Sequence, residues 1–263
     1  MLRAVLLDLD ETLIHERAST RAALVATLAD ACGVQGGDPV AVGAHVLAAA
    51  AELWRAGPCL AHCRRLGISS WEGLWATFSR GDDAATVALR GWAPLYRREA
   101  WRRGTASLGL PEDTCAELAE GFVWERGRRQ ARFAETLPAL VALKAQGLLL
   151  CLLTNGDADL QRRKAAGSGL LPLLDQVVIS GELGIGKPEP GIFAHALGLC
   201  GARPEEAVMV GDSPERDISG AAAAGIRAVW LDRFGAGGTP PGAWRVLPDL
   251  RGLPALLHPA ARS

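Results

Sequence analysis

The sequence predicts an α/β fold: a parallel sheet with helices on both faces, into which a second, all-helical domain is inserted. Two patterns lead to this prediction. From residue 136 onward, short apolar runs alternate with helical stretches, which is typical of parallel sheets covered on both faces. The first apolar run, residues 5–7, is instead followed by residues 15–132 without a convincing strand. A connection of that length is too long for a simple crossover, so it is predicted to be a separate domain.

The inserted block is predicted to form a small helical bundle. Prolines and glycines, which end helices, divide it near Pro39, Pro58, residues 81–82 and Pro111. The helices are expected over residues 18–33, 39–56, 71–80, 83–103 and 112–130. Six of the chain's eight tryptophans lie in this block. We expect them to fill the core of the bundle, although some could line a substrate cleft.

The rest of the chain is predicted to build the sheet. Apolar runs predict strands over residues 5–7, 148–153, 176–179, 207–211 and 227–231. Helices are expected over residues 136–146, 158–167, 189–200 and 214–224, and a short amphipathic helix near 250–257, after a glycine- and proline-rich loop at 235–242. The predicted domains are therefore a Rossmann-like α/β core, residues 1–14 and 133–263, and a helical domain, residues 15–132.

The composition excludes several classes of partner. With a formal net charge of −1, the chain has no overall field that would attract nucleic acid or an anionic membrane. No apolar run approaches membrane-spanning length, and residues 1–3 lead into a strand rather than a signal peptide. The six cysteines lack the spacing of a disulfide framework or a zinc site. We therefore expect a cytoplasmic protein, a monomer or homodimer, that acts on a small molecule.

Carboxylates follow the first predicted strand. Asp8 and Asp10 are spaced i and i+2, so in an extended backbone both side chains point the same way. Two neighbouring negative charges repel, and a hard divalent cation such as Mg²⁺, which prefers oxygen ligands, would offset that repulsion. The alternative is that both residues are ordinary turn formers after a strand. Ligands of open parallel sheets bind outside the carboxyl ends of the strands. Ligand-binding residues are therefore also expected at the ends of the other predicted strands.

The next strand ends also carry polar groups. Thr154, Asn155 and Gly156 follow the second core strand, where a hydroxyl and free backbone N–H groups at a helix start can bind an anion. The alternative is that these residues form only a turn and a helix cap, in which asparagine and glycine are common. Lys187 lies in a loop of glycines and prolines and is one of only three lysines among 28 basic residues. Its ammonium is a compact charge suited to a phosphate oxygen or a carboxylate, although a solvated loop lysine is the simpler interpretation.

A second pair of carboxylates follows the strand at residues 207–211. Asp212 lies where this strand ends, and Asp217 follows one helical turn into the next element, after Ser213 and a proline suited to a helix start. Each of these turns is unremarkable alone. An acid pair, a hydroxyl with amides, a lysine and a second acid pair at four strand ends, in that order, are hard to attribute to chance.

These four motifs resemble those of the haloacid dehalogenase superfamily, in the group with a helical cap domain inserted after the first motif. The resemblance covers the whole core, and the motifs look most like those of N-acylneuraminate-9-phosphatase and related sugar phosphate or nucleotide phosphatases. It implies a Mg²⁺-dependent phosphatase that hydrolyses a small phosphate monoester through an aspartyl-phosphate intermediate. The inserted helical domain, residues 15–132, would be the cap that sets specificity.

The resemblance also implies a role for each motif residue. Asp8 would be the nucleophile and Asp10 the general acid and base, while the metal ligands would be Asp8, the backbone carbonyl of Asp10, and Asp212. The phosphate would be bound by Thr154, Asn155, Gly156 and Lys187, and the metal ligands and water would be oriented by Thr12, Ser213 and Asp217. Dehalogenases of the family lack an acid at the position of Asp10. A phosphomutase or phosphotransferase of the same fold stays an alternative, as does a catalytically quiet small-molecule-binding regulatory protein.

Overall fold

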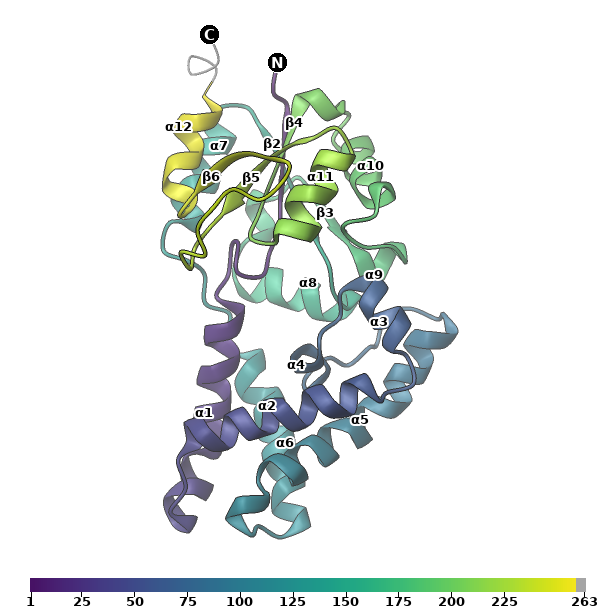
Figure 1. The fold of residues 1–263 in the computed structure, drawn as a ribbon, viewed down its shortest axis with the longest axis vertical. Coiled ribbons are helices and arrows are strands. Elements are labelled where there is room, and N and C mark those ends of the chain that lie inside the picture. The colour runs from purple at the N-terminus through teal and green to yellow at the C-terminus, as the bar shows by residue number, and fades with distance from the viewer. Residues whose placement is uncertain (259–263) are drawn as a thin grey trace. The chain divides into compact units, whose positions relative to one another are not determined.

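A six-stranded, entirely parallel sheet forms the core of the protein, as the computed structural model of residues 1–258 shows (Figure 1). The strand order is β3-β2-β1-β4-β5-β6, with β1 in the interior of the sheet. The strands are β1 (Ala4–Leu7), β2 (Leu149–Thr154), β3 (Gln176–Ile179), β4 (Ala207–Gly211), β5 (Arg227–Leu231) and β6 (Ala243–Leu247). The α/β class and the first five strands are confirmed. The edge strand β6 was not predicted, because its residues are only half-buried and lack a continuous apolar run.

The sheet is buried on both faces. Alternate residues of the central strands, such as Leu6 and Met209, pack with Ile192 and Phe193 of α10 into one apolar cluster. Their neighbours along the strands, such as Val5, point to the opposite face, where α7 and α12 pack together. The elements of this compact unit are α7 (Thr136–Ala145), η2 (Leu171–Leu173), α9 (Ser180–Leu183), α10 (Pro190–Leu199), η3 (Pro204–Glu206), the π-helical turn η4 (Pro214–Ser219), α11 (Gly220–Ala223), η5 (Leu250–Gly252) and α12 (Leu253–Leu257).

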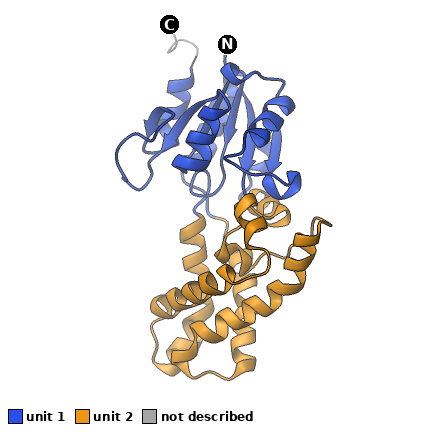
Figure 2. Cartoon of the chain, turned by 45° about the vertical axis from the view of Figure 1, so that its right-hand side comes forward, with its two compact units in different colours: residues 1–15, 131–155, 168–263 blue, residues 16–130, 156–167 orange. Residues whose placement is uncertain are grey.

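A second compact unit is all-helical (Figure 2). Its elements are α1 (Glu16–Gln35), α2 (Pro39–Arg55), α3 (Leu60–Leu66), α4 (Ser70–Gly73), α5 (Ala84–Gly104), η1 (Ala106–Leu108), α6 (Glu112–Gly127) and α8 (Ala158–Gly167). Trp54, Trp75 and Trp101 are buried in its apolar core, as predicted for the tryptophans of this block. Trp71 and Trp124 are exposed instead. None of the described helices is long and apolar enough to cross a membrane.

The predicted helix over residues 71–80 was wrong. The structure has instead the short helix α3, which lies before residue 71, and the single helical turn α4. A capping box between Ser69 and Glu72 begins α4, which ends at Gly73. From Leu74 to Phe78, four of five successive side chains are fully buried, and one face of a helix could not bury them all. Phe78 also adopts a left-handed backbone conformation, with φ of 51°.

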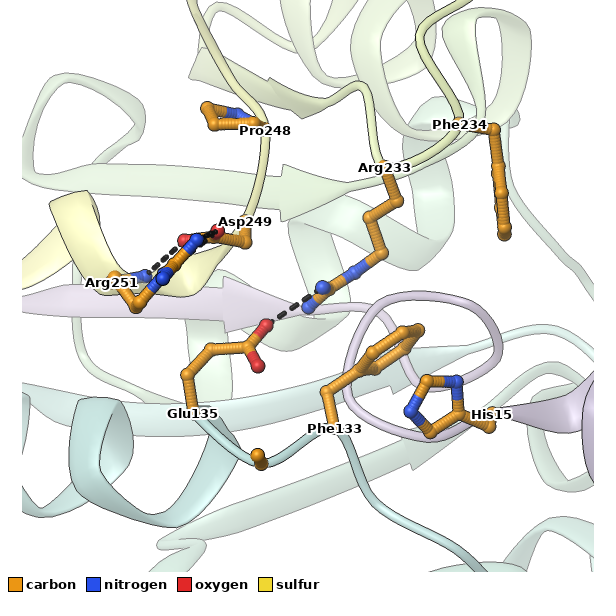
Figure 3. Close-up of a pocket in the computed structure, with 9 residues that line it drawn as sticks. His15, Phe133, Glu135, Arg233, Phe234, Pro248, Asp249 and Arg251 are labelled. Atoms are coloured by element: carbon orange, nitrogen blue, oxygen red, sulfur yellow. Dashed lines mark hydrogen bonds and ion pairs between the residues drawn. The ribbon is translucent and has the colours of Figure 1, made fainter.

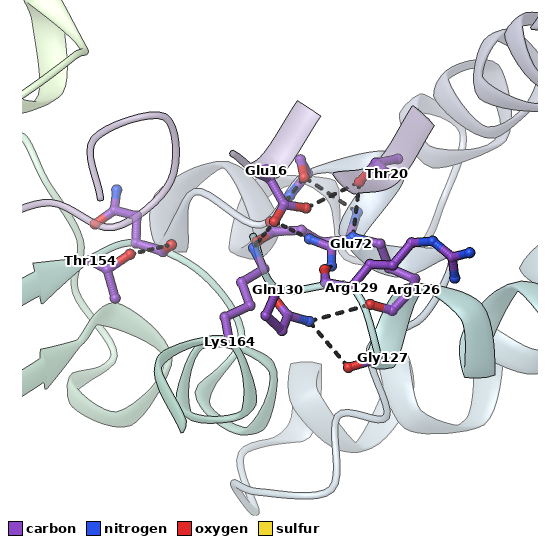
Figure 4. A network of polar contacts seen from close by, with 11 residues as sticks. Glu16, Thr20, Glu72, Arg126, Gly127, Arg129, Gln130, Thr154 and Lys164 are labelled. Carbon is purple, nitrogen blue, oxygen red and sulfur yellow. Dashed lines mark hydrogen bonds and ion pairs between the residues drawn. The ribbon is translucent and has the colours of Figure 1, made fainter. Parts of the chain in front are cut away.

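Helix α8 belongs to the helical unit, although its sequence lies among the core strands. Lys164 of α8 is fully buried, and its Nζ lies 2.9 Å from Glu72 Oε1 and 3.4 Å from Glu16 Oε2 (Figure 4). Glu16 also pairs with the buried Arg126. The compact units are therefore residues 1–15, 131–155 and 168–263, and residues 16–130 and 156–167. The expected division at 15–132 placed α8 in the core, because sequence order gives no sign of these long-range ion pairs.

Candidate active site

The motif residues of the α/β unit meet at the carboxyl edge of the sheet. Lys187 Nζ lies 2.7 Å from Asp8 Oδ1 and 2.6 Å from Asp217 Oδ1, so the lysine bridges the two carboxylates. All three side chains are buried. Burial of a charge is costly unless it is paired, and this arrangement pairs one cation with two anions. The two carboxylates raise the pKa of Lys187 against the lowering effect of its burial, which keeps the ammonium charged.

Asn155 fixes the position of Lys187. Its side-chain Oδ1 accepts a hydrogen bond from the backbone N–H of Lys187, and its Nδ2 donates to the backbone carbonyl of Lys187, both at 2.8 Å. Gly220 supports the same loop from α11, because a Cβ there would lie 2.9 Å from Pro188 Cα. The loop of the third motif is thus held by the second motif and by a helix packed closely behind it.

Asp212 completes a cluster of three carboxylates. Oxygen atoms of Asp8, Asp212 and Asp217 all lie within 4.8 Å of one another. Burial raises the pKa of Asp8 to about 7, with the charge of Asp217 adding to the effect and Lys187 opposing it. Burial also raises the pKa of Asp212 to about 8, with help from the charges of Asp8 and Asp217. One ammonium therefore does not neutralise the cluster, and a divalent cation would favour its ionised form.

The turn after β4 places Asp217 against the end of the strand. A π-helical turn follows Ser213, whose carbonyl accepts from the N–H groups of Asp217 at 3.0 Å and Ile218 at 3.3 Å. Ser213 in turn donates its own backbone N–H to Asp217 Oδ2 at 3.0 Å. A Cβ at Gly211 would lie only 2.2 Å from Asp217 Oδ2, so only glycine fits there. Gly211 belongs to the fourth motif but was not among the predicted site residues, although its place next to Asp212 was a signal.

The first motif continues into a tight loop. Leu9 O accepts hydrogen bonds from three successive backbone N–H groups, of which the shortest, from Leu13, is 2.8 Å. Glu11 has a left-handed φ of 57° and donates its N–H to Ile14 O at 2.9 Å. Asp10 lies at the start of this loop and is partly exposed. The hydroxyl of Thr12 is buried without a hydrogen-bond partner among residues 1–258.

The second motif continues from β2 into the helical unit. Thr154 is buried at the end of β2, and its hydroxyl lies 3.4 Å from the carbonyl oxygen of Asn155. Gly156 has φ of 143°, and a Cβ there would lie 2.8 Å from the side chain of Gln161. Hydrogen bonds, ion pairs and the carboxylate cluster thus bring together Asp8, Asn155, Lys187, Asp212, Ser213 and Asp217. Thr154 ends β2, and Asp10, Thr12 and Gly156 lie on the loops that follow β1 and β2.

Comparison with known proteins gives a consistent result. A family model described as a haloacid dehalogenase-like hydrolase matches residues 2–225. A phosphoserine phosphatase of Thermus thermophilus is 41% identical over 250 residues, which cover 95% of each chain. An N-acylneuraminate-9-phosphatase of Rattus norvegicus is 37% identical over 143 residues, which cover 52% of this chain and 57% of the relative.

Solved structures also match over the full chain. A 2-haloacid dehalogenase from Pseudomonas syringae covers 98% of both chains at 27% identity, with a TM-score of 0.61. A phosphatase of the same superfamily from Thermococcus onnurineus covers 97% of this chain and 98% of its own, at 26% identity and a TM-score of 0.56. The structural neighbours thus include both dehalogenases and phosphatases.

Proposed function

This chain belongs to the haloacid dehalogenase-like hydrolase family and is a phosphoric monoester hydrolase, and we propose that it works with Mg²⁺ through an aspartyl-phosphate on Asp8. The observation that carries the proposal is the bridge from Asp8 through Lys187 to Asp217, with Asp212 beside it. The bridge leaves the second carboxylate oxygen of Asp8 outside the ion pair and places the ammonium of Lys187 beside Asp8. Such a reaction needs a carboxylate nucleophile to attack phosphorus and a cation to bind the phosphate oxygens.

The carboxylates fit a divalent cation. Asp8, Asp212 and the backbone carbonyl of Asp10 would hold Mg²⁺, which supplies positive charge that offsets repulsion between the carboxylates and the phosphate. Both carboxylate oxygens of Asp217 are already used, by Lys187 and by the N–H of Ser213. Asp217 would therefore orient Lys187 and its loop instead of binding the metal.

Asp8 and Asp10 would carry out the formation and hydrolysis of the aspartyl-phosphate, and other motif residues would bind the phosphate. Asp8 would attack phosphorus, and Asp10 would give a proton to the leaving alcohol and later take one from the attacking water. Lys187 has three N–H donors, of which two are directed at Asp8 and Asp217, so the third can reach a phosphate oxygen. Thr154 and the backbone N–H groups of Asn155 and Gly156 would bind the other oxygens, and Thr12 and Ser213 would support the first and fourth motifs.

We propose O-phosphoserine as the first substrate to test. The relative named phosphoserine phosphatase aligns with 95% of this chain, which includes the helical unit expected to act as the cap and to set specificity. The match to N-acylneuraminate-9-phosphatase covers only 52% of the chain. Sugar phosphates and nucleotides are therefore the second group of candidates. A phosphomutase would require that the intermediate be protected from water, and a regulatory binding protein would show no turnover.

A panel assay tests the proposal. O-phosphoserine, sugar phosphates and nucleotides should be incubated with Mg²⁺, with Ca²⁺ and after exhaustive chelation. We expect phosphate release with Mg²⁺, little with Ca²⁺ because its looser coordination misplaces the nucleophile, and none after chelation. Chloride release from 2-chloropropionate, measured in parallel, tests dehalogenation, which the acid at Asp10 disfavours. Full activity after chelation would contradict the metal assignment, and chloride release without phosphate release would contradict the reaction class.

A further inference from the structure

We propose that Arg233 is a positioning residue for Asp10, which it would hold in place through the carbonyl of Thr12. The inference rests on the proposed role of Asp10 as general acid. Arg233 lies two residues beyond the end of β5, a strand end to which the four motifs assign nothing. Its side chain is only 5% exposed and reaches back to the loop that follows β1.

Arg233 contacts two segments at once: residues 133–135 (Figure 3) and the loop that follows β1. Its Nη2 donates to the carbonyl of Thr12 at 2.7 Å, and its Nη1 lies 2.7 Å from Glu135 Oε1. Its guanidinium lies 3.5 Å from the ring centroid of Phe133, which is close enough for a cation–π contact. The phenyl ring of Phe133 in turn packs against the ring of His15, with 3.6 Å between centroids. Arg233 thus joins the loop of Asp10 to residues 133–135.

The loop of Asp10 depends on such support from outside. The carbonyls of Thr12 and Leu13 accept no hydrogen bond from within residues 9–14, and each accepts from a side chain elsewhere in the unit, Leu13 O also from the backbone N–H of Phe133 at 3.3 Å. Thr136 Oγ1 donates to Leu13 O at 2.8 Å, and Arg233 donates to Thr12 O. Glu11, between Asp10 and Thr12, has the left-handed φ of 57°, which costs free energy for a residue with a side chain. A loop with such a backbone is kept in one conformation by the contacts around it.

Lysine could not replace this arginine. The planar guanidinium directs one nitrogen at Thr12 and the other at Glu135, while its face covers Phe133. An ammonium is a point charge with no such geometry, so it could satisfy one partner but not both together with the ring contact. Because general acid catalysis requires hydrogen-bond distance to the leaving oxygen, a small displacement of Asp10 should cost rate without abolishing phosphate binding.

The test compares two esters in four enzymes. Turnover of O-phosphoserine, whose leaving alcohol needs a proton, and of nitrophenyl phosphate, whose leaving group does not, is measured in the wild type, Arg233→Met, Asp10→Asn and the double variant. We expect Arg233→Met to lower kcat/KM, which reports formation of the aspartyl-phosphate, by roughly 10- to 100-fold for the alkyl ester and much less for nitrophenyl phosphate. The comparison uses kcat/KM because kcat also includes hydrolysis of the intermediate, which both esters share. In the Asp10→Asn background, Arg233→Met should have no further effect on the alkyl ester. If the wild type does not turn over O-phosphoserine, an alkyl ester found active in the substrate panel takes its place.

Two controls separate positioning from general stability. Arg251 lies at the same pocket, of about 570 Å³, but pairs with Asp249 at the surface, so Arg251→Met should leave both rates unchanged. Arg233 also lines this pocket. Because the pocket lies next to the position that Arg233→Ala would vacate, added guanidinium should restore part of the alkyl-ester activity of that variant.

Equal losses on both esters, or independent losses in the double variant, would overturn the inference and leave Arg233 as a stabilising residue. If Asp10→Asn alone impairs both esters equally, the acid role of Asp10 fails, and the inference fails with it. A wild type without turnover of any phosphate ester would refute the proposed function itself.

Discussion

Asn155 holds the backbone of Lys187 from both sides, accepting from its N–H and donating to its carbonyl at 2.8 Å each. Through these two bonds, the residue that follows β2 sets where the ammonium of Lys187 meets Asp8. Since Lys187 is buried, its backbone groups have little access to water as an alternative partner. The side-chain amide of Asn155 therefore positions Lys187, in addition to the phosphate-binding role that we propose for its backbone N–H.

Removal of this amide should reduce turnover as well as stability. Asn155→Ala leaves two buried backbone groups unpaired, at a cost of about 1–3 kcal/mol each, and frees the loop of Lys187. We expect kcat to fall by at least about tenfold. Gln146 is the matched control, because its amide binds the carbonyl of Pro254 at 2.9 Å away from the motif residues. Gln146→Ala should lower the unfolding midpoint with kcat unchanged, and equal kcat losses in both variants would contradict the role of Asn155.

Gly211 should tolerate no side chain. Gly211→Ala would place Cβ 2.2 Å from Asp217 Oδ2, and relief of such a clash costs about 1–3 kcal/mol and displaces the partner of Lys187. We expect lower stability in urea and lower activity. At Gly198, in α10, a Cβ would meet nothing within 4 Å, so Gly198→Ala should raise stability by up to about 1 kcal/mol. An unaltered midpoint and rate for Gly211→Ala would refute the close packing of Asp217.

The metal-free protein should lose stability as pH rises. The folded-state pKa values of Asp8 and Asp212 are raised to about 7 and about 8, above those of the unfolded chain. Between pH 4 and 8 the native state therefore binds more protons than the unfolded state, so stability falls across this range. Mg²⁺ competes with those protons, so its increase in Tm should be larger at pH 8 than at pH 6. Thermal unfolding with and without Mg²⁺ measures this, and a shift independent of pH would contradict it.

Lys164 and Lys144 should differ sharply in their contribution to stability. Lys164→Met would leave the buried carboxylates of Glu16 and Glu72 without their shared cation, which costs about 3–5 kcal/mol. Lys144 pairs with Asp175 at a site where the two side chains are 36% and 26% exposed, so Lys144→Met should cost less than about 1 kcal/mol. Urea unfolding of both variants makes the comparison. Equal losses would show that the buried network of Figure 4 does not hold α8 in the helical unit.

The placement of the motif residues at one edge of the sheet could be predicted because each motif is local in the sequence. Asp8 and Asp212 directly follow buried strands and Thr154 ends one, and the carboxyl ends of parallel strands share one edge of the sheet. What sequence reasoning missed depends on distant contacts. The bonds of Asn155 to Lys187 join positions 32 residues apart, and those of Arg233 to Thr12 join positions 221 residues apart.

The errors in the fold have the same physical origin. Residues 71–80 contain good helix formers, but burial of Leu74, Trp75, Ala76 and Phe78 in the core of the helical unit overrides that propensity. The helix predicted over residues 158–167 is confirmed, because α8 spans Ala158–Gly167. Its place in the helical unit depends on the pairing of Lys164 with Glu72, 92 residues away, which no local pattern indicates.

Trapping of the intermediate tests most directly whether Asp8 carries the phosphoryl group during turnover. Wild-type protein turning over its best phosphate ester is quenched in acid within one turnover, and the modified residue is identified by mass spectrometry. We predict phosphate on Asp8 in the wild type and neither adduct nor turnover in Asp8→Asn, whose near-isosteric amide is a poor nucleophile. Phosphate on a serine, histidine or cysteine, or turnover retained in Asp8→Asn, would contradict the account.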